Sequence, residues 1–334
     1  MAIDFNGKTI LITGGAGFIG SNLAFWFQEN FPGARVVVFD LFRTGETFAN
    51  GNLRSFGHYR NLMGFKGEIV TGDITKREDL DRLRDFRFDY IFHEAAISDT
   101  TVQDQKIMME TNLNAFKDLL KMAKETGAGM IYASSGATYG NAPAPQTVGR
   151  EDPANIYGFS KLAMDHLASQ WMKESDRPIV GLRYFNVYGP REYYKNKTAS
   201  MVLQFGHQIL AGKRPRLFEG SDKILRDFIY IDDVIQANIK ACDPKRSGVY
   251  NVGTGKARSF QDIVDILQKE LGTELPCEYI PNPFVGQYQF FTQADIEPTR
   301  EDLGYEPGVT LEEGIRRYLP EIIRLFEEEV GSKK

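Results

Sequence analysis

Eight residues near the start of the chain, TGGAGFIG (13–20), restrict its fold more than any other part of the sequence. They place Gly14, Gly17 and Gly20 at G-x-x-G-x-x-G spacing, between an apolar run, KTILIT (8–13), and a helical pattern. Glycines at such a turn let the chain reverse tightly, let the backbone approach a pyrophosphate and let the helix pack on the strand. The helix N-terminus then offers free N–H groups to phosphates. The segment therefore predicts a dinucleotide-binding turn after the first strand of a parallel sheet.

An acidic residue supports this interpretation. Asp40 ends the next apolar run, RVVVFD (35–40), and falls 20 residues after Gly20, where a carboxylate reaches the adenosine ribose hydroxyls. Asp40 favours the free 2′-hydroxyl of NAD, whereas Arg43 could neutralise the 2′-phosphate of NADP. Arg43 is equally explained as a solvated loop residue, so the choice of coenzyme stays open.

The rest of the first half alternates short β-branched runs with longer helical patterns, which is typical of an α/β protein with a Rossmann-type, doubly wound parallel sheet. One run, PIVGLRYFNVYG (178–189), predicts a sixth strand. After Pro190 the order loosens into a smaller, mixed α/β lobe. We expect a coenzyme-binding domain over residues 1–178, with later strands from about 179–190 and 225–252. Residues 191–334 would mainly form a C-terminal substrate lobe.

Composition narrows the class of partner. The net charge of −5 and the pI of about 5.6 speak against broad attraction to nucleic acid or to an anionic membrane. No apolar run has the ~20 residues needed to span a bilayer, and the start of the chain lacks the pattern of a signal peptide. Cys242 and Cys277 lack metal-ligand spacing, so we expect reduced thiols and no metal site. These features predict a cytoplasmic protein.

A tyrosine and a lysine form the candidate catalytic pair. Tyr157 and Lys161 stand at Y-x-x-x-K spacing on a predicted helix, so they share one face. A free phenol has a pKa of ~10, and a nearby ammonium would lower it toward neutrality. Ser134 and Ser135 end the preceding strand and can donate a hydrogen bond to a substrate oxygen. A Tyr/Lys pair on a helix surface is common by chance, but not after a dinucleotide-binding turn.

With these motifs the chain resembles the extended short-chain dehydrogenase/reductase family. The similarity covers essentially the whole chain and is carried by TGGAGFIG, GDI (72–74), HEAA (93–96), YASSGATYG (132–140), YGFSK (157–161) and RYFNVYGP (183–190). It implies a tightly bound NAD(P) used for hydride transfer on a nucleotide-activated sugar, and a homo-oligomer. Together with the glycine turn, it implies coenzyme contacts from Gly14, Gly17, Phe18, Ile19, Gly20, Asp40, Arg43, Asp73, Ile74, Ala95, Ala96, Ile97, Asn112, Tyr157, Lys161 and Val187.

The segment SSGATYG (134–140) argues against one branch of this family. Dehydratases of the family place an Asp-Glu pair directly after the catalytic Ser or Thr, whereas this chain has Gly136, Ala137 and Thr138. No acid is thus placed to protonate a leaving hydroxyl. Epimerases remain, and those that turn a side-chain ketone about one bond need acid/base groups on both faces.

A second candidate acid/base group lies in GPREYYKNKTASM (189–201), which carries Lys195 and Lys197. A solvated basic loop is the alternative explanation for both. Lys195 is favoured because its offset from Gly189 needs no gap in the family pattern. Relatives usually have a small Gly-Ser step after this lysine, whereas this chain has Asn196 and Lys197, so Lys197 could instead bind phosphate or compete for the role.

Within the family, the chain is most similar to enzymes that invert C6 of ADP-glycero-manno-heptose. RYFNVYGPRE followed by a lysine, LFEGS (217–221), RDF (226–228) and QYQFFTQADI (287–296) carry this likeness. It implies Tyr157 and Lys195 as the two acid/base groups, with NADP as the recycled coenzyme. The implied substrate contacts are Ser135, Asn186, Lys197, Phe218, Glu219, Gly220, Ser221, Arg226 and Tyr288. Two alternatives remain: another NDP-hexose epimerase or reductase using Tyr157 alone, and a silent NAD(P)-sensing or scaffold protein.

Overall fold

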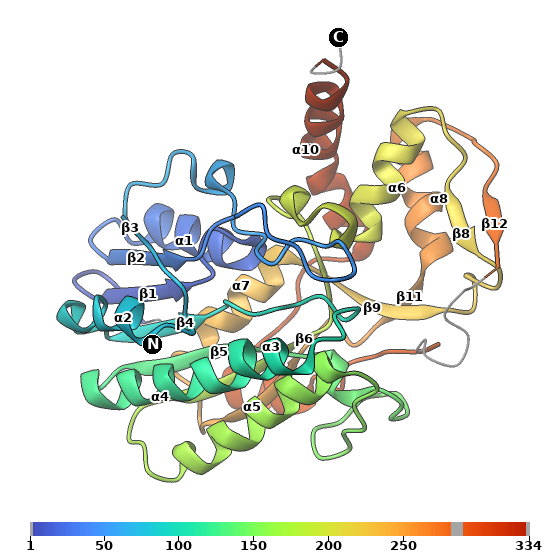
Figure 1. The fold of residues 1–334 in the computed structure, drawn as a ribbon. Helices are drawn as coiled ribbons and strands as arrows, with labels where there is room; N and C mark the ends of the chain where they lie inside the picture. The colour runs from blue at the N-terminus through green and yellow to red at the C-terminus, as the bar shows by residue number, and fades with distance from the viewer. Residues whose placement is uncertain (1–2, 282–289, 332–334) are drawn as a thin grey trace.

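The computed structural model describes residues 3–281 and 290–331, and its centre is a seven-stranded sheet (Figure 1). The strand order is β10-β6-β5-β4-β1-β2-β3, and every neighbouring pair is parallel. The strands are β1 (Thr9–Thr13), β2 (Arg35–Asp40), β3 (Glu68–Thr71), β4 (Tyr90–His93), β5 (Gly129–Ser135), β6 (Ile179–Tyr184) and β10 (Gly248–Val252). The order reverses between β1 and β4, so ligands are expected at the carboxyl ends of these strands. The predicted doubly wound sheet is confirmed.

Helices cover both faces of this sheet, which explains why its strands read as continuous apolar runs. Side chains alternate along β1, so Ile10 and Ile12 pack on one side and Leu11 on the other. The first side is covered by α1 (Phe18–Asn30) and α7 (Ile231–Lys240), and the second by α4 (Ala115–Thr126) and α5 (Ile156–Met172). The site is therefore built on a rigid, doubly covered sheet.

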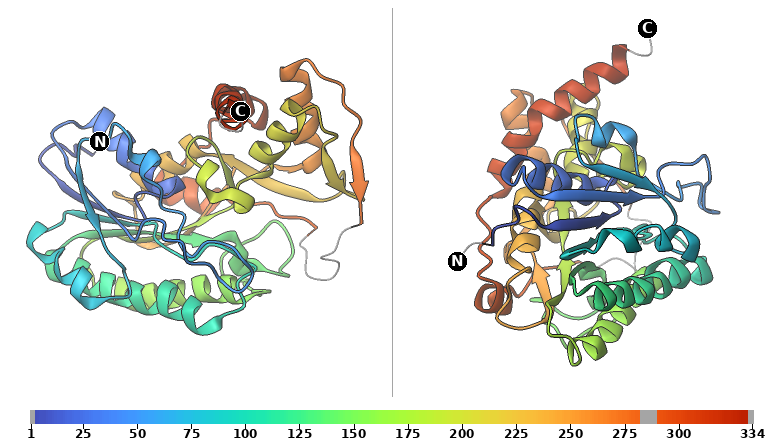
Figure 2. Two further views of the ribbon diagram at one scale, coloured as in Figure 1. Left: turned by 45° about the horizontal axis from the view of Figure 1, so that its top comes forward. Right: turned by 90° about the vertical axis from the view of Figure 1, so that its left-hand side faces the viewer.

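A smaller mixed lobe stands at one end of the molecule, to the right in Figure 1 and in the left view of Figure 2. It contains a three-stranded sheet, β11-β9-β7, and a two-stranded sheet, β12-β8. Its strands are β7 (Asn186–Tyr188), β8 (Arg216–Phe218), β9 (Leu225–Tyr230), β11 (Ala257–Ser259) and β12 (Glu278–Ile280). The helices α6 (Met201–Leu210), α8 (Phe260–Leu271) and α10 (Leu311–Gly331) pack together there.

The remaining helices are short and lie in the connections. They are α2 (Arg77–Asp81), α3 (Gln105–Met109), α9 (Glu297–Leu303), and the single turns η1 (Tyr59–Leu62), η2 (Arg84–Phe86), η3 (Glu110–Asn114), η4 (Gly136–Tyr139) and η5 (Tyr193–Thr198). The turn η3 is a π-helical turn between α3 and α4, and it lies inside residues 109–128, METNLNAFKDLLKMAKETGA, whose amphipathic pattern predicts a single helix.

The predicted sixth strand differs from the structure in one respect. It is two strands: β6 belongs to the large sheet and β7 to the small one, with Phe185 between them. The Phe185 N–H donates to the Val252 carbonyl at 3.0 Å, so the chain leaves the large sheet beside β10. In the segment 225–252, β10 joins the large sheet whereas β9 joins the small one. The division of the chain into two domains remains a prediction.

Candidate active site

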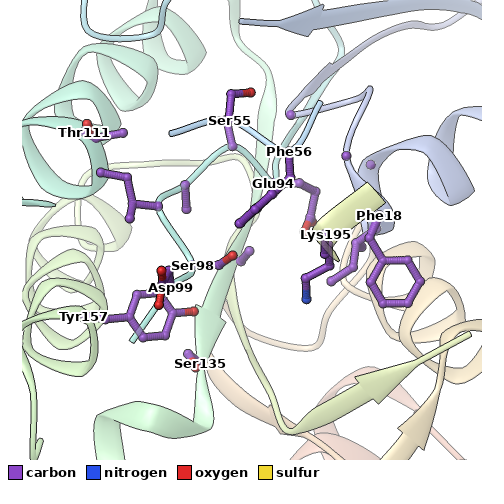
Figure 3. Close-up of a pocket in the computed structure, with 18 of the residues that line it drawn as sticks. Phe18, Ser55, Phe56, Glu94, Ser98, Asp99, Thr111, Ser135, Tyr157 and Lys195 are labelled. Atoms are coloured by element: carbon purple, nitrogen blue, oxygen red, sulfur yellow. The ribbon is translucent and has the colours of Figure 1, made fainter. Parts of the chain in front are cut away.

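A cavity of about 430 Å³ opens at the carboxyl ends of the central strands, between α1, α5 and the segment after β7 (Figure 3). Predicted residues from both halves of the chain line it together. They are Gly14, Gly17, Phe18, Ile19, Gly20, Asp40, Asp73, Ile74, Ala95, Ala96, Ile97, Ser135, Tyr157, Lys161, Asn186, Val187 and Lys195. The expected coenzyme contacts and the expected catalytic groups thus share one cavity.

The glycine turn leaves no room for side chains. Gly14 has φ of +68°, and a Cβ on it would lie 2.6 Å from the Ala95 nitrogen. A Cβ on Gly20 would lie 2.4 Å from the Gly14 carbonyl oxygen. Among the described side chains none caps the N-terminus of α1 at Gly17, so its first N–H groups stay available to an anion. This arrangement fits the pyrophosphate of a dinucleotide.

Asp40 fastens the glycine turn to the second strand. Its carboxylate accepts hydrogen bonds from the Ala16 N–H at 2.9 Å and the Phe42 N–H at 2.7 Å. Burial raises the pKa of Asp40, and these two hydrogen bonds oppose the rise. Arg43 does not line the cavity; its guanidinium donates to the Tyr194 carbonyl. The residue considered for a 2′-phosphate is therefore engaged by the segment that carries Lys195.

The first turn of α5 presents Tyr157 to the cavity. Asn155 caps this helix, its side-chain oxygen accepting from the Gly158 N–H at 2.9 Å. Burial raises the pKa of Tyr157, while a hydrogen bond with Ser135 lowers it. Lys161 donates to the Ala133 carbonyl at 2.7 Å, and burial lowers its pKa to about 8. The ammonium is thus directed at the backbone, and the hydrogen bond that favours the phenolate comes from Ser135.

Lys195 reaches the same cavity from the opposite wall, and its amine and the Tyr157 hydroxyl both point into the cavity (Figure 3). It lies in η5, where its N–H donates to the Glu192 carbonyl at 2.9 Å and its ammonium sits 5.7 Å from the centre of the Phe18 ring. Burial lowers the pKa of Lys195, which favours the neutral amine that an acid/base group needs. Lys197 is exposed and lies outside the residues that line the cavity.

Glu94 also lines the cavity, although no pattern in the sequence predicts a role for it. It follows β4 directly, and its carboxylate accepts from the Tyr184 hydroxyl at 2.9 Å. Asn238 in turn donates to that hydroxyl at 2.9 Å. Burial raises the pKa of Glu94 to about 7. An acid directly after a buried strand, in the motif HEAA, was the signal that could have found it. Phe56, Ser98, Asp99, Thr111 and Thr292 also line the cavity.

Several predicted residues lie elsewhere. Asn112 is buried behind the wall, where it accepts from the Ile97 N–H at 2.9 Å and donates to the Ile97 carbonyl at 3.1 Å. Arg226 is buried on β9, with its guanidinium 6.0 Å from the centre of the Phe260 ring. Of the described residues expected at the site, those outside the cavity lining are Arg43, Asn112, Lys197, Phe218, Glu219, Gly220, Ser221 and Arg226. Tyr288 lies outside the described residues.

Two further features bear on the class of protein. In residues 3–281 and 290–331, no group of His, Cys, Asp or Glu is arranged to hold a metal ion. Over the same ranges, every helix is too short or too polar to cross a membrane.

Comparisons with known proteins identify the family of the chain. Residues 10–253 match the model of the NAD dependent epimerase/dehydratase family. The ADP-L-glycero-D-manno-heptose-6-epimerase of Helicobacter pylori is 53% identical, with a TM-score of 0.89, over 97% of this chain and 98% of that one. The UDP-glucose 4-epimerase of Thermotoga maritima is 30% identical (TM-score 0.83; 95% and 99%). The UDP-glucuronic acid 4-epimerase of Bacillus cereus, solved with UDP-glucuronic acid and NAD, is 29% identical (TM-score 0.80; 95% and 99%).

The fold and the site are those of a dinucleotide-binding enzyme, with a cavity at the carboxyl ends of a doubly wound sheet that joins a glycine turn to Tyr157 and Lys161. The chain belongs to the NAD-dependent epimerase/dehydratase family, the extended branch of the short-chain dehydrogenases/reductases. The expected class of enzyme, an NAD(P)-dependent nucleotide-sugar epimerase, is confirmed.

Proposed function

We propose that this enzyme inverts C6 of ADP-glycero-manno-heptose through a transient 6-ketone, with NADP as its tightly bound coenzyme. The observation that carries the proposal is the placement of Tyr157 and Lys195 on opposite walls of one cavity. The 53% identity to a heptose 6-epimerase over nearly the whole of both chains supports the choice of sugar.

Two acid/base groups suit a carbon outside the sugar ring. C6 of a heptose can turn about the C5–C6 bond, so its oxygen faces one wall before the turn and the other wall after it. A proton acceptor on one side and a proton donor on the other then serve the two half-reactions. An enzyme that turns the whole sugar can reuse one tyrosine, and Lys195 would have no role.

The nicotinamide coenzyme, when bound, supplies the acceptor and donor of the hydride at C6. Ser135 hydrogen-bonds to the reacting oxygen and holds it beside Tyr157. The group on the first face accepts the hydroxyl proton as the ketone forms. The group on the second face donates a proton to the ketone oxygen as the inverted alcohol forms. Each turnover therefore exchanges the protonation states of Tyr157 and Lys195, and solvent restores them.

The test is incubation of the purified protein with ADP-D-glycero-D-manno-heptose in deuterated water, followed by NMR of the sugar. Conversion to the L-glycero epimer without deuterium at C6 is the expected result, because the same hydride returns. We further expect Lys195→Met to lower kcat by about 10²–10⁴, as loss of a general acid/base does. Activity only on UDP- or dTDP-hexoses, with Lys195→Met unimpaired, would favour an epimerase or reductase that uses Tyr157 alone.

A further inference from the structure

Lys195 follows β7 in the chain, yet the residues around it contact α1 and the segment after β2, on the side of the molecule expected to bind the coenzyme. We call residues 190–197 the lysine strap. The Asn22 side chain on α1 donates to the Pro190 carbonyl at 3.0 Å. The Arg191 guanidinium donates to the Asn61 carbonyl at 2.6 Å and lies 3.9 Å from the centre of the Phe25 ring. The start of the strap is therefore held by α1 and by the segment after β2.

Tyr194, the residue before Lys195, contacts two residues of the segment after β2. Its ring is stacked on His58 with 3.7 Å between ring centres and 5° between ring planes. Its carbonyl accepts from the Arg43 guanidinium. With ring centres 3.7 Å apart and planes nearly parallel, the two rings lie face to face in direct contact. These two partners of Tyr194 come from a single segment of the chain, while its ring also packs against that of Tyr193.

That segment, residues 41–58, also forms the wall of the cavity beside Asp40. We call it the β2 loop. Its cavity-lining residues are Leu41, Phe48, Leu53, Arg54, Ser55, Phe56 and Gly57. The His58 N–H donates to the carbonyl of Ala16 in the glycine turn at 3.0 Å, and the Arg43 N–H donates to the Gly57 carbonyl at 2.7 Å. One loop thus touches both the adenosine end of the cavity and the neighbour of Lys195.

The backbone on either side of Lys195 adds a reason for such support. Arg191 and Asn196 have φ of +74° and +54°, a region that side-chain-bearing residues rarely adopt. Such conformations persist only where the surrounding contacts hold them. The stack on His58 and the hydrogen bond from Arg43 are contacts of this kind.

We propose that His58 and Tyr194 are positioning residues that couple the adenosine end of the coenzyme cavity to Lys195. A coenzyme that orders the β2 loop holds His58 against Tyr194, and Tyr194 sets where the Lys195 ammonium enters the cavity. The catalytic consequence rests on the proposed function; the coupling between the two segments does not. Because coupling between sites is reciprocal, a loosened strap also weakens coenzyme binding.

Hydrogen exchange measures the coupling without reference to any sugar. Protein freed of coenzyme is compared with the same protein resupplied with NADP⁺. In the wild type we expect slower exchange in both 41–58 and 190–197. In His58→Ala we expect slower exchange in 41–58 alone. Met63→Ala, an exposed residue of the neighbouring segment, is the control and should behave as the wild type does. If NADP⁺ slows exchange in 190–197 as much in His58→Ala as in the wild type, the proposal is wrong.

Kinetics then separate positioning from mere structural support. Tyr194→Ala should lower kcat about tenfold with KM changed less than twofold, as slight misplacement of a reacting group does. Tyr194→Phe keeps the stacked ring and should recover most of the rate. The double variant Tyr194→Ala with Lys195→Met should be no slower than Lys195→Met alone. Independent, multiplying losses would contradict a role through Lys195. If even the wild type leaves ADP-heptose unchanged, the proposed function fails while the exchange result still decides the coupling.

Discussion

The two ends of the cavity are built in different ways. Beside the glycine turn, the wall is backbone packed on backbone. A Cβ added at Gly14 or Gly20 would lie less than 3 Å from nearby backbone atoms. Beside Lys195, the wall is a strap held by side chains that come from distant parts of the sequence. A side chain added to the first wall at Gly14 or Gly20 would meet backbone, whereas the second wall is held by contacts between side chains and distant segments.

This difference matches what each end has to do. A pyrophosphate needs N–H groups fixed at a helix N-terminus, and rigidity serves that purpose. A sugar that enters, turns and leaves needs a wall that can adjust, and loops provide it. Changes in the first wall should therefore affect binding of coenzyme and folding, whereas changes in the second should affect turnover.

The largest effect is expected from Gly20→Ala. The new methyl group would lie 2.4 Å from the Gly14 carbonyl oxygen, so either the turn or α1 must move. We expect the purified variant to retain almost no coenzyme, and so to lose activity altogether, because the N–H groups of α1 lose their alignment. Coenzyme retained after gel filtration measures it. Gly331→Ala, which meets nothing within 4 Å, is the control. Full coenzyme content in Gly20→Ala would show that the glycine turn can move to accept a methyl group without losing its N–H groups for the coenzyme.

Tyr157→Phe should come next. Removing the hydroxyl deletes one acid/base group and its hydrogen bond with Ser135 without creating a cavity. We expect kcat to fall by about 10²–10⁴ while coenzyme stays bound, since the ring still fills its place. Turnover assays and absorbance of the bound coenzyme measure the two quantities. Equal losses of coenzyme and of rate would mean that the Tyr157 hydroxyl holds the coenzyme and does not act as an acid/base group.

Glu94→Gln tests whether the free energy of unfolding depends on pH through the Glu94 carboxyl, which lines the cavity. Burial raises the pKa of Glu94 to about 7, above the value of about 4.3 in an unfolded chain. The folded state then binds more protons between these pH values, so stability falls as pH rises from about 4.5 to 7 and stays level above. Glu94→Gln removes this loss and should be stabilised by about 3 kcal/mol at pH 8 but hardly at pH 4.5.

Urea unfolding of Glu94→Gln at the two pH values measures the difference. The exposed Glu274→Gln serves as the matched control. A stability change that is the same at both pH values would rule out titration of Glu94 as its cause.

The smallest effect is expected at Asn196, the residue after Lys195. Its φ of +54° suits glycine better than asparagine. Asn196→Gly should therefore be neutral or more stable by up to about 1 kcal/mol, and Asn196→Ala less stable by a similar amount. Thermal unfolding of the two variants gives the comparison. The opposite order would show that the Asn196 side chain, and not its backbone, shapes the strap.

Much of the cavity beside the glycine turn could be predicted because each of its sequence patterns lies within a short stretch of chain. The glycine spacing, Asp40 at the end of a strand, and Tyr157 and Lys161 one turn apart are all read within short segments, and all of them line the cavity. The doubly wound sheet followed from alternating strand and helix patterns, and the structure confirms it. The strand break at Phe185 could not be read, because an apolar run looks the same whether it stays in one sheet or crosses to another.

The wall beside Lys195 was harder to predict because its contacts join residues that are far apart in the sequence. Nothing in the spacing of His58 and Tyr194 indicates that their rings stack, since more than a hundred residues separate them. Arg43 was considered for a phosphate, and its donation to the Tyr194 carbonyl depends on the tertiary fold. The segment 218–221 was expected at the sugar, but it lies outside the lining of the cavity that the described residues form.

The strand crossing at Phe185 has a consequence for how such enzymes diversify. Upstream of it, β1 to β6 supply the glycine turn, Asp40 and the Tyr157 pair; downstream lie the strap and the small sheets. One peptide step separates the two, so substitutions downstream can alter which sugar is accepted without changing the glycine turn, Asp40 or the Tyr157 pair. Such substitutions reach the dinucleotide through the contact of the lysine strap with the β2 loop, so the accepted sugar can diverge among relatives as long as Tyr194 keeps its partners His58 and Arg43.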